Sequence, residues 1–184
     1  MLAVQPQSPQ KKKSNAYLVF QLDGSDYAIG VENVTEIITS IQCSPVPGSP
    51  DFLIGVANLR GRILPMVDLR KRFQYEQRNT DRACFMIVSL ESEEETLELG
   101  LKIDSVSEVA RIPIEMIDAA PAMSKFADRL VFSGVAKINS GAKLIVDAKT
   151  LVAQLKEAIT FAYCDDLTKQ SRFTAPTQAA GYSH

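Results

Sequence analysis

The sequence contains an internal repeat, and this repeat constrains the fold more than any other feature. Residues 55–69 (GVANLRGRILPMVDL) and 134–148 (GVAKINSGAKLIVDA) align without gaps, and Gly, Val, Ala, Val and Asp coincide. Upstream of each, VTEI at 34–37 matches VSEV at 106–109 in the same order. Short strands separated by regular turns are typical of small barrels and sandwiches. We therefore expect a mainly β chain of two similar small β-barrels packed together; the alternative is chance matching between β-rich segments.

Alternation of apolar and polar residues predicts the individual strands. It is clearest at 97–103, where leucine or isoleucine occupies every second position. A helical turn is expected at 69–73 and a short C-terminal helix at 148–158, because leucine and valine recur there at helical spacing. The predicted strands are 17–22, 27–31, 34–39, 52–59 and 63–69, followed in the second half by 83–90, 97–103, 130–138 and 143–146.

Composition separates an ordered body from two polar ends. Residues 1–14, which include three consecutive lysines at 11–13, show no periodicity and predict a disordered arm. The body spans 15–155, with the first barrel at about 15–80 and the second at about 81–147. Residues 160–184 are rich in Gln, Ala, Ser and Thr and predict a flexible tail.

The residue inventory argues against catalysis. His184 is the only histidine and the last residue, so histidine acid–base chemistry and Cys/His zinc sites are not expected. No glycine-rich phosphate loop is present. Three widely spaced cysteines, not preceded by an expected signal peptide, indicate a cytoplasmic protein with reduced thiols. We expect a protein that binds others, with no catalytic residue, no metal and no cofactor.

The repeat also separates structural from functional residues. Glycine and aspartate recur at 55 and 134 and at 68 and 147, which indicates bulges and helix caps. Asn58, Arg60, Gly61 and Pro65 occur only in the first half and are the better functional candidates. Charge is divided as well: residues 60–78 hold six basic and two acidic residues, and 81–118 hold ten acidic and three basic ones. Such a division suits two partners or head-to-tail assembly.

Three segments resemble the CheW family, the coupling proteins of bacterial chemosensory arrays. They are residues 17–38 (YLVFQLDGSDYAIGVENVTEII), 52–73 (FLIGVANLRGRILPMVDLRKRF) and 100–121 (GLKIDSVSEVARIPIEMIDAAP). The resemblance covers about 16–155, and its most specific part is GVxNLRGxxLPxVDLR. It implies two SH3-like, five-stranded β-barrels and a non-catalytic adaptor. Such an adaptor binds the cytoplasmic tip of a methyl-accepting chemotaxis receptor and the regulatory domain of a CheA-type histidine kinase, peripheral to the membrane.

The resemblance also implies two binding surfaces. Receptor contact is expected in a groove beside the first VxEI strand and the NLRG turn, at Val34, Glu36, Ile37, Asn58, Arg60 and Gly61. Glu36 and Arg60 could equally pair with each other and shape that groove. The kinase or ring contact is expected at Asp118 and Met123, where well-studied chemotaxis members carry arginine and phenylalanine. The charge reversal at Asp118 implies a different partner surface.

Two alternatives remain open at the level of the sequence. One keeps the fold and assigns the adaptor to a pilus-linked twitching or phototaxis system. The other is a small β-barrel that binds nucleic acid, suggested by Arg70-Lys71-Arg72-Phe73-Gln74-Tyr75. The balanced overall charge disfavours this second alternative.

Overall fold

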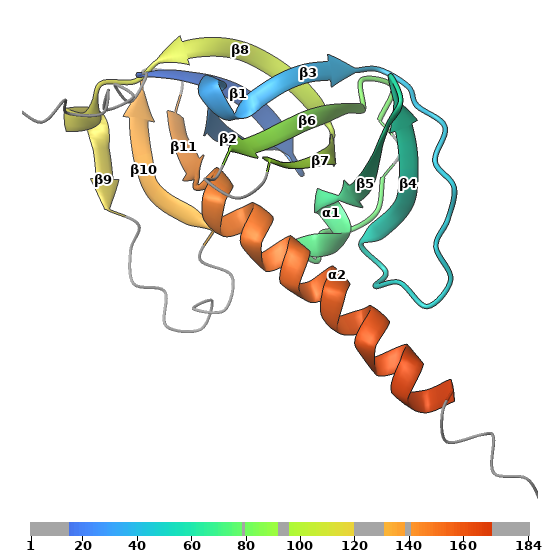
Figure 1. The fold of residues 1–184 in the computed structure, drawn as a ribbon. Helices are drawn as coiled ribbons and strands as arrows, with labels where there is room; N and C mark the ends of the chain where they lie inside the picture. Colours follow the sequence, from blue (N-terminus) through green and yellow to red (C-terminus); the bar gives the residue numbers. More distant parts are fainter. Residues whose placement is uncertain (1–14, 79, 92–95, 120–130, 139–140, 171–184) are drawn as a thin grey trace, which may run out of the picture.

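The computed structural model describes residues 15–78, 80–91, 96–119, 131–138 and 141–170, with side chains as far as residue 160. Two sheets, of six and five strands, pack together in the described chain (Figure 1). The first has the order β8 (Ser105–Arg111), β1 (Ala16–Leu22), β2 (Ser25–Gly30), β11 (Gly141–Val146), β10 (Phe132–Ile138) and β9 (Ile117–Ala119). The second has the order β3 (Val34–Ile38), β6 (Cys84–Glu91), β7 (Thr96–Ile103), β5 (Arg62–Asp68) and β4 (Leu53–Leu59).

Within the described ranges, four helical segments connect or flank the strands. They are η1 (Val31–Asn33), α1 (Leu69–Arg72), η2 (Ile114–Met116) and α2 (Ala148–Gln170). Apart from the three-residue β9, each described sheet has five strands. The predicted fold class, mainly β with two similar five-stranded units, is therefore confirmed. The sequence did not indicate β9, and it indicated β8 only through the match of VSEV to VTEI, not as a predicted strand. No helix among the described residues is long and apolar enough to cross a membrane.

The two halves of the chain exchange their first hairpins. The β1–β2 hairpin joins the strands of the second half, where β1 pairs with β8 and β2 pairs in parallel with β11. The β6–β7 hairpin joins the first half, where β6 pairs with β3 and β7 pairs in parallel with β5. The division into barrels at 15–80 and 81–147 thus does not follow the strand pairing. A repeat has the same sequence whether each hairpin pairs within its own half or with the other, so the repeat could not reveal the exchange.

Recurring residues perform the same structural task in both sheets. Gly55 and Gly134 each lie at a register shift, and a Cβ on Gly55 would lie 2.2 Å from the Ser44 carbonyl oxygen. Asp68 accepts a hydrogen bond from the Lys71 amide at 3.2 Å. Asp147 accepts one from the Thr150 amide at 3.0 Å. The bulges and helix caps predicted from the repeat are confirmed.

The largest apolar cluster of the described residues joins both sheets and the final helix, and each sheet has a smaller cluster of its own. Leu151, Val152 and Leu155 of α2 are buried in the largest cluster. The helix continues beyond this contact and runs away from the sheets (Figure 1). It extends to Gln170, so the predicted end at 158 and the predicted flexible tail from 160 are wrong for this segment. Residues 159–170 contain no glycine or proline, so no residue type that ends a helix interrupts it. The arm at 1–14 lies outside the described residues.

Candidate functional site: a turn and an edge strand

The β4–β5 turn is a two-residue hairpin loop made by Arg60 and Gly61. Leu59 and Arg62 pair across it, and φ is 53° at Arg60 and 86° at Gly61. Positive φ at both loop residues matches the twist of the flanking strands, and Asn-Gly is the usual choice at these positions. The Asn58 Oδ1 accepts a hydrogen bond from the Gly61 amide at 2.8 Å, which fixes the loop. Arginine therefore occupies a position whose backbone conformation it disfavours.

Strand β3 lies at the edge of the five-stranded sheet, because it pairs with β6 alone among the described strands. Its register shifts between Val34 and Glu36, and the Thr35 hydroxyl donates to the Ile87 carbonyl at 3.3 Å. Val34 packs against the core and is half-buried, whereas Ile37 is exposed. Of the two apolar residues predicted to contact a receptor, only Ile37 thus presents an open side chain.

Arg60 joins the turn to the edge strand. Its Nη2 lies 2.8 Å from the Glu36 Oε1, with the Arg60 side chain 73% exposed and that of Glu36 27% exposed. The alternative in which these two residues pair with each other is therefore observed. An exposed pair of this kind contributes little to stability and can exchange partners easily. We call Glu36, Ile37, Asn58, Arg60, Gly61 and the neighbouring Ile63 the turn surface.

Ile63 was missed by the sequence analysis. It lies directly across from Asn58 on β5, and its side chain is 63% exposed. The signal was available, because Leu64 and Met66 are buried and alternation places Ile63 on the outside. The turn surface thus carries two exposed isoleucines in addition to a charged pair.

The second predicted surface is only partly described. Asp118 lies in β9, at the edge of the six-stranded sheet, and is exposed. Its carboxylate lies 3.1 Å from the Lys137 ammonium, also at the surface. Met123 lies outside the described residues. The structure therefore places Asp118 on the other sheet from the turn surface and does not bring the two predicted surfaces together.

A buried arginine, Arg70, binds two carboxylates at the junction of the two sheets, and we call these contacts the clasp. Arg70, at the start of α1, is 8% exposed and donates from Nε and Nη2 to the two oxygens of Asp104, both at 2.6 Å. Its Nη1 donates to Asp23 in the β1–β2 turn at 3.2 Å. Burial alone would raise the pKa of Asp104, but hydrogen bonds from Arg70 and from the Asp23 amide outweigh it and hold that pKa below its usual value. Nothing in the apolar pattern marked Arg70 as buried.

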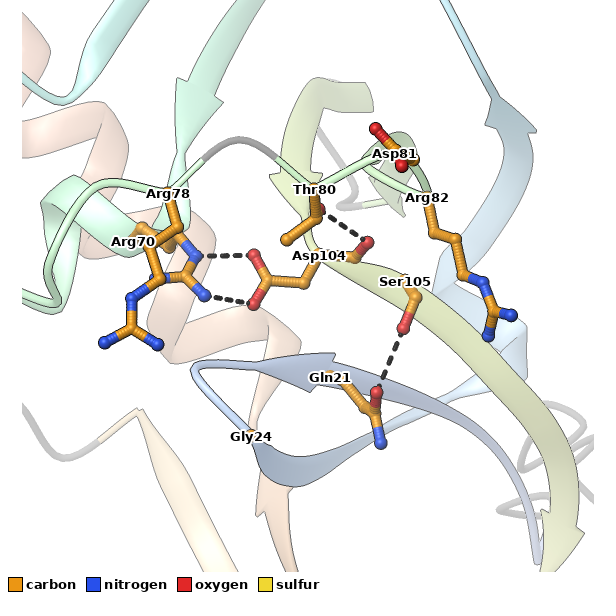
Figure 2. Close-up of a pocket in the computed structure, with 9 residues that line it drawn as sticks. All are labelled: Gln21, Gly24, Arg70, Arg78, Thr80, Asp81, Arg82, Asp104 and Ser105. Atoms are coloured by element: carbon orange, nitrogen blue, oxygen red, sulfur yellow. Dashed lines mark hydrogen bonds and ion pairs between the residues drawn. The ribbon is translucent and has the colours of Figure 1, made fainter.

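A pocket of about 420 Å³ opens beside this clasp, and Figure 2 shows its lining. Arg70, Arg78 and Arg82 line it together with Asp81 and Asp104. Arg78 pairs with Glu76 at 2.8 Å, as Arg70 does with Asp104 and Asp23. Since the cations are largely matched by neighbouring carboxylates, the pocket has no clear preference for a charged ligand. We therefore interpret the pocket as a space between elements that ion pairs hold together, and not as a ligand site.

In the basic stretch that suggested nucleic-acid binding, two arginines and both aromatic residues make contacts within the protein. Arg70 forms the clasp, and the Arg72 guanidinium lies 5.8 Å from the centre of the Phe52 ring and donates to Gln154. Phe73 and Tyr75 contact each other edge-on within an aromatic cluster. These rings are therefore committed to packing and do not form a platform on which bases could stack.

Two of the three cysteines have described side chains. Cys43 is half-buried and Cys84 is buried, and both are free thiols. Burial raises the pKa of each thiol, which disfavours the reactive thiolate. Neither has the environment of a nucleophile.

Comparison with known proteins places this arrangement in a family. The CheW-like domain family matches residues 16–156. The chain is 29% identical to the chemotaxis protein CheW of Klebsiella aerogenes over 143 residues, covering 78% of this chain and 84% of that protein. It is 32% identical to CheW of Bacillus subtilis over 111 residues, covering 60% and 69%. The crystal structure of the scaffolding protein TtCheW from Thermoanaerobacter tengcongensis matches with a TM-score of 0.64 and 29% identity, covering 71% of this chain and 87% of that one.

Proposed function

The chain belongs to the CheW-like family of chemotaxis adaptor proteins, and we propose that it couples the cytoplasmic tip of a chemoreceptor to a CheA-type histidine kinase without catalysing a reaction. In this proposal the receptor binds the turn surface and the kinase binds the sheet that carries Asp118. The two surfaces lie on different sheets. One adaptor can therefore hold both partners at once.

The observation that carries the receptor half of the proposal is the strained, exposed Arg60. A residue held in a disfavoured backbone conformation at the surface points to a functional constraint. Its guanidinium offers several donors to a carboxylate, and the Glu36 pair already orients it. Ile37 and Ile63 add apolar contacts. A receptor helix that presents an apolar stripe flanked by acidic residues would fit this surface.

Support for the kinase half comes from the charge of the β9 edge. Asp118 is exposed, and its ion pair with Lys137 lies at the surface, where water competes with it. A partner that places a basic group opposite Asp118 would be attracted to it. Well-studied chemotaxis members carry arginine at the position of Asp118. The aspartate therefore requires a kinase surface with a basic group at this contact.

The proposal is tested by capture of partners from lysate of the source cells. Wild type, Arg60→Glu and Arg78→Glu serve as baits, followed by mass spectrometry. Arg78 is the matched control, because it also is an exposed arginine with a carboxylate at 2.8 Å. We expect wild type and Arg78→Glu to retain a receptor and a CheA-type kinase, and Arg60→Glu to lose the receptor alone. Failure of the wild-type protein to capture either partner at micromolar concentration would contradict the adaptor function.

The same experiment separates the pathway alternatives. A receptor that controls pilus-driven or light-directed movement would assign the chain to that system. A receptor of flagellar chemotaxis would assign the chain to a chemotaxis array.

A further inference from the structure

The six-stranded sheet carries an apolar patch at the end of β8. Val109, Ile114 and Met116 are 62%, 68% and 52% exposed, and we call them the rim patch. Val109 lies on the edge strand β8, and the other two lie in η2, which follows it directly. Three large apolar side chains exposed within one stretch, residues 109–116, indicate a surface that is covered in use.

Acidic residues adjoin the rim patch. Glu115 lies within η2 between the two apolar residues, whereas Glu108, next to Val109 in β8, points to the opposite face of that strand. Glu32 lies close to the start of β1, because a Cβ on Gly30 would lie 2.6 Å from the Glu32 Oε1 and Gly30 pairs with Tyr17. Among the described residues Glu32 and Glu115 are in no ion pair, and Glu108 approaches the Lys143 ammonium only at 4.0 Å. An occupant of this surface should therefore be apolar and basic.

The chain itself enters the structure at this place. Ala16 pairs with Arg111, and the carbonyl oxygen of Asn15 accepts a hydrogen bond from the Ile112 amide at 2.8 Å. Because β1 and β8 are antiparallel, the start of β1 lies at the end of β8, close to where η2 follows in the chain. Lys11–Lys13 stand two to four residues before Asn15, which corresponds to a reach of about 7 to 14 Å.

The sequence of residues 1–14 has the required chemistry. It contains Met-Leu-Ala-Val at 1–4 and three lysines at 11–13, joined by a segment with prolines at 6 and 9. Proline favours an extended chain, and six residues of this kind span about 19 Å. That length allows the apolar end to return along β8 while the lysines remain near η2.

We propose that residues 1–14 dock on the rim patch of their own chain, with Lys11–Lys13 against Glu32 and Glu115 and with Leu2 and Val4 against Val109, Ile114 and Met116. Docking within the chain benefits from the short connection at Asn15, because it replaces a bimolecular association with an intramolecular one. The exposed ion pairs make the contact sensitive to salt. The docking does not depend on the proposed function, but it covers the stretch that leads into Asp118.

Zero-length carbodiimide crosslinking of the full chain, read by peptide mass spectrometry, tests this proposal. The reagent joins a lysine to a carboxylate only when the two are in contact. We expect Lys11–Lys13 to join Glu32 or Glu115 in the monomer at least about fivefold more often than Glu157, an equally exposed carboxylate on α2, and the excess to vanish in 1 M salt. Yields at both Glu32 and Glu115 that are no higher than at Glu157 would overturn the docking.

A charge swap controls for altered folding. Replacing the three lysines by glutamate should abolish the crosslinks and change the NMR methyl signals of Ile114 and Met116, and adding Glu32→Lys and Glu115→Lys should restore those signals. Methyl signals that do not respond to the lysine substitutions would refute the apolar contact. Crosslinks confined to the dimer band would show that a second copy occupies the patch, and would equally overturn docking within one chain.

Discussion

Arg60 and Arg70 show how two arginines of one sequence motif take opposite roles. Arg60 is exposed at a positive φ, paired loosely with Glu36. Arg70 is buried and holds Asp104 with two short hydrogen bonds. The motif identified both positions, and the repeat separated Arg60 from the residues that serve the fold. Residue types alone could not distinguish the exposed arginine from the buried one, because burial depends on where the exchanged hairpin places Asp23 and Asp104.

The strain at Arg60 predicts that relieving it raises the stability of the fold and weakens receptor binding. Arg60→Asn should raise the free energy of unfolding by about 0.5 kcal/mol, because asparagine tolerates positive φ better and the lost surface ion pair is worth little. The same variant should capture less receptor. Urea denaturation measures the first effect and the pull-down the second. A variant that binds as well as wild type would remove the functional reason for the strain.

The clasp predicts a dependence of stability on pH. The pKa of Asp104 is lowered in the folded protein, so its stabilisation is present above the unfolded pKa of about 3.9 and is lost as pH falls through the folded value. Asp104→Asn should cost about 2 kcal/mol at pH 7, because it removes the carboxylate that accepts two hydrogen bonds from a buried arginine and leaves only Asp23 as an anionic partner. Denaturation curves between pH 3 and 7 should show the difference between the two proteins shrinking toward the acid end. A constant difference would contradict this assignment.

At the scale of elements, β9 and its neighbours depend on a close approach of backbones. A Cβ on Gly134 would lie 2.5 Å from the Ile117 Cγ2 and 2.6 Å from the Asp118 carbonyl oxygen. Strand β9 would have to move to accept it. The sequence predicted that Gly134 serves the fold, but β9 itself was missed, because three residues are too few for an alternating pattern.

Gly134→Ala should therefore displace β9 and weaken capture of the kinase more than that of the receptor. Gly24→Ala is the control, since nothing lies within 4 Å of its Cβ and its strain comes from φ alone. Amide chemical shifts of 117–119 report the displacement, and the pull-down reports the partners. Equal loss of both partners in Gly134→Ala would indicate general unfolding and contradict a local effect.

For the molecule as a whole, the exchange of hairpins makes the two sheets one folding unit. The number and type of most strands could be predicted, because alternation and turn residues are local signals. The pairing of β2 with β11 and of β5 with β7 could not, because it joins segments distant in sequence. The length of α2 was underestimated because the polar composition of 160–184 was interpreted as a tail, although Ile159, Ala162 and Tyr163 continue the helical spacing of Leu151, Val152 and Leu155.

Expression of the two halves as separate fragments tests whether the chain folds as one unit. Expressed separately, residues 1–80 and 81–184 should each remain unfolded, because β3 then lacks β6 and β1 lacks β8. Expressed together, they should form a stable complex with the dispersed NMR spectrum of the whole chain. Independent folding of either fragment would show that its strands can pair without exchange.

The connections between the sheets have a mechanical consequence. Strand β7 ends at Ile103 and β8 begins at Ser105, so a single residue, Asp104, links the two sheets there, and Arg70 grips that residue. The β2-to-β3 crossing is spanned by the three residues of η1. Connections this short leave no flexible linker between the two sheets. A force on the turn surface is therefore transmitted through the backbone to the opposite sheet. Tilting of one bound partner would be passed to the other as rotation of a stiff lever.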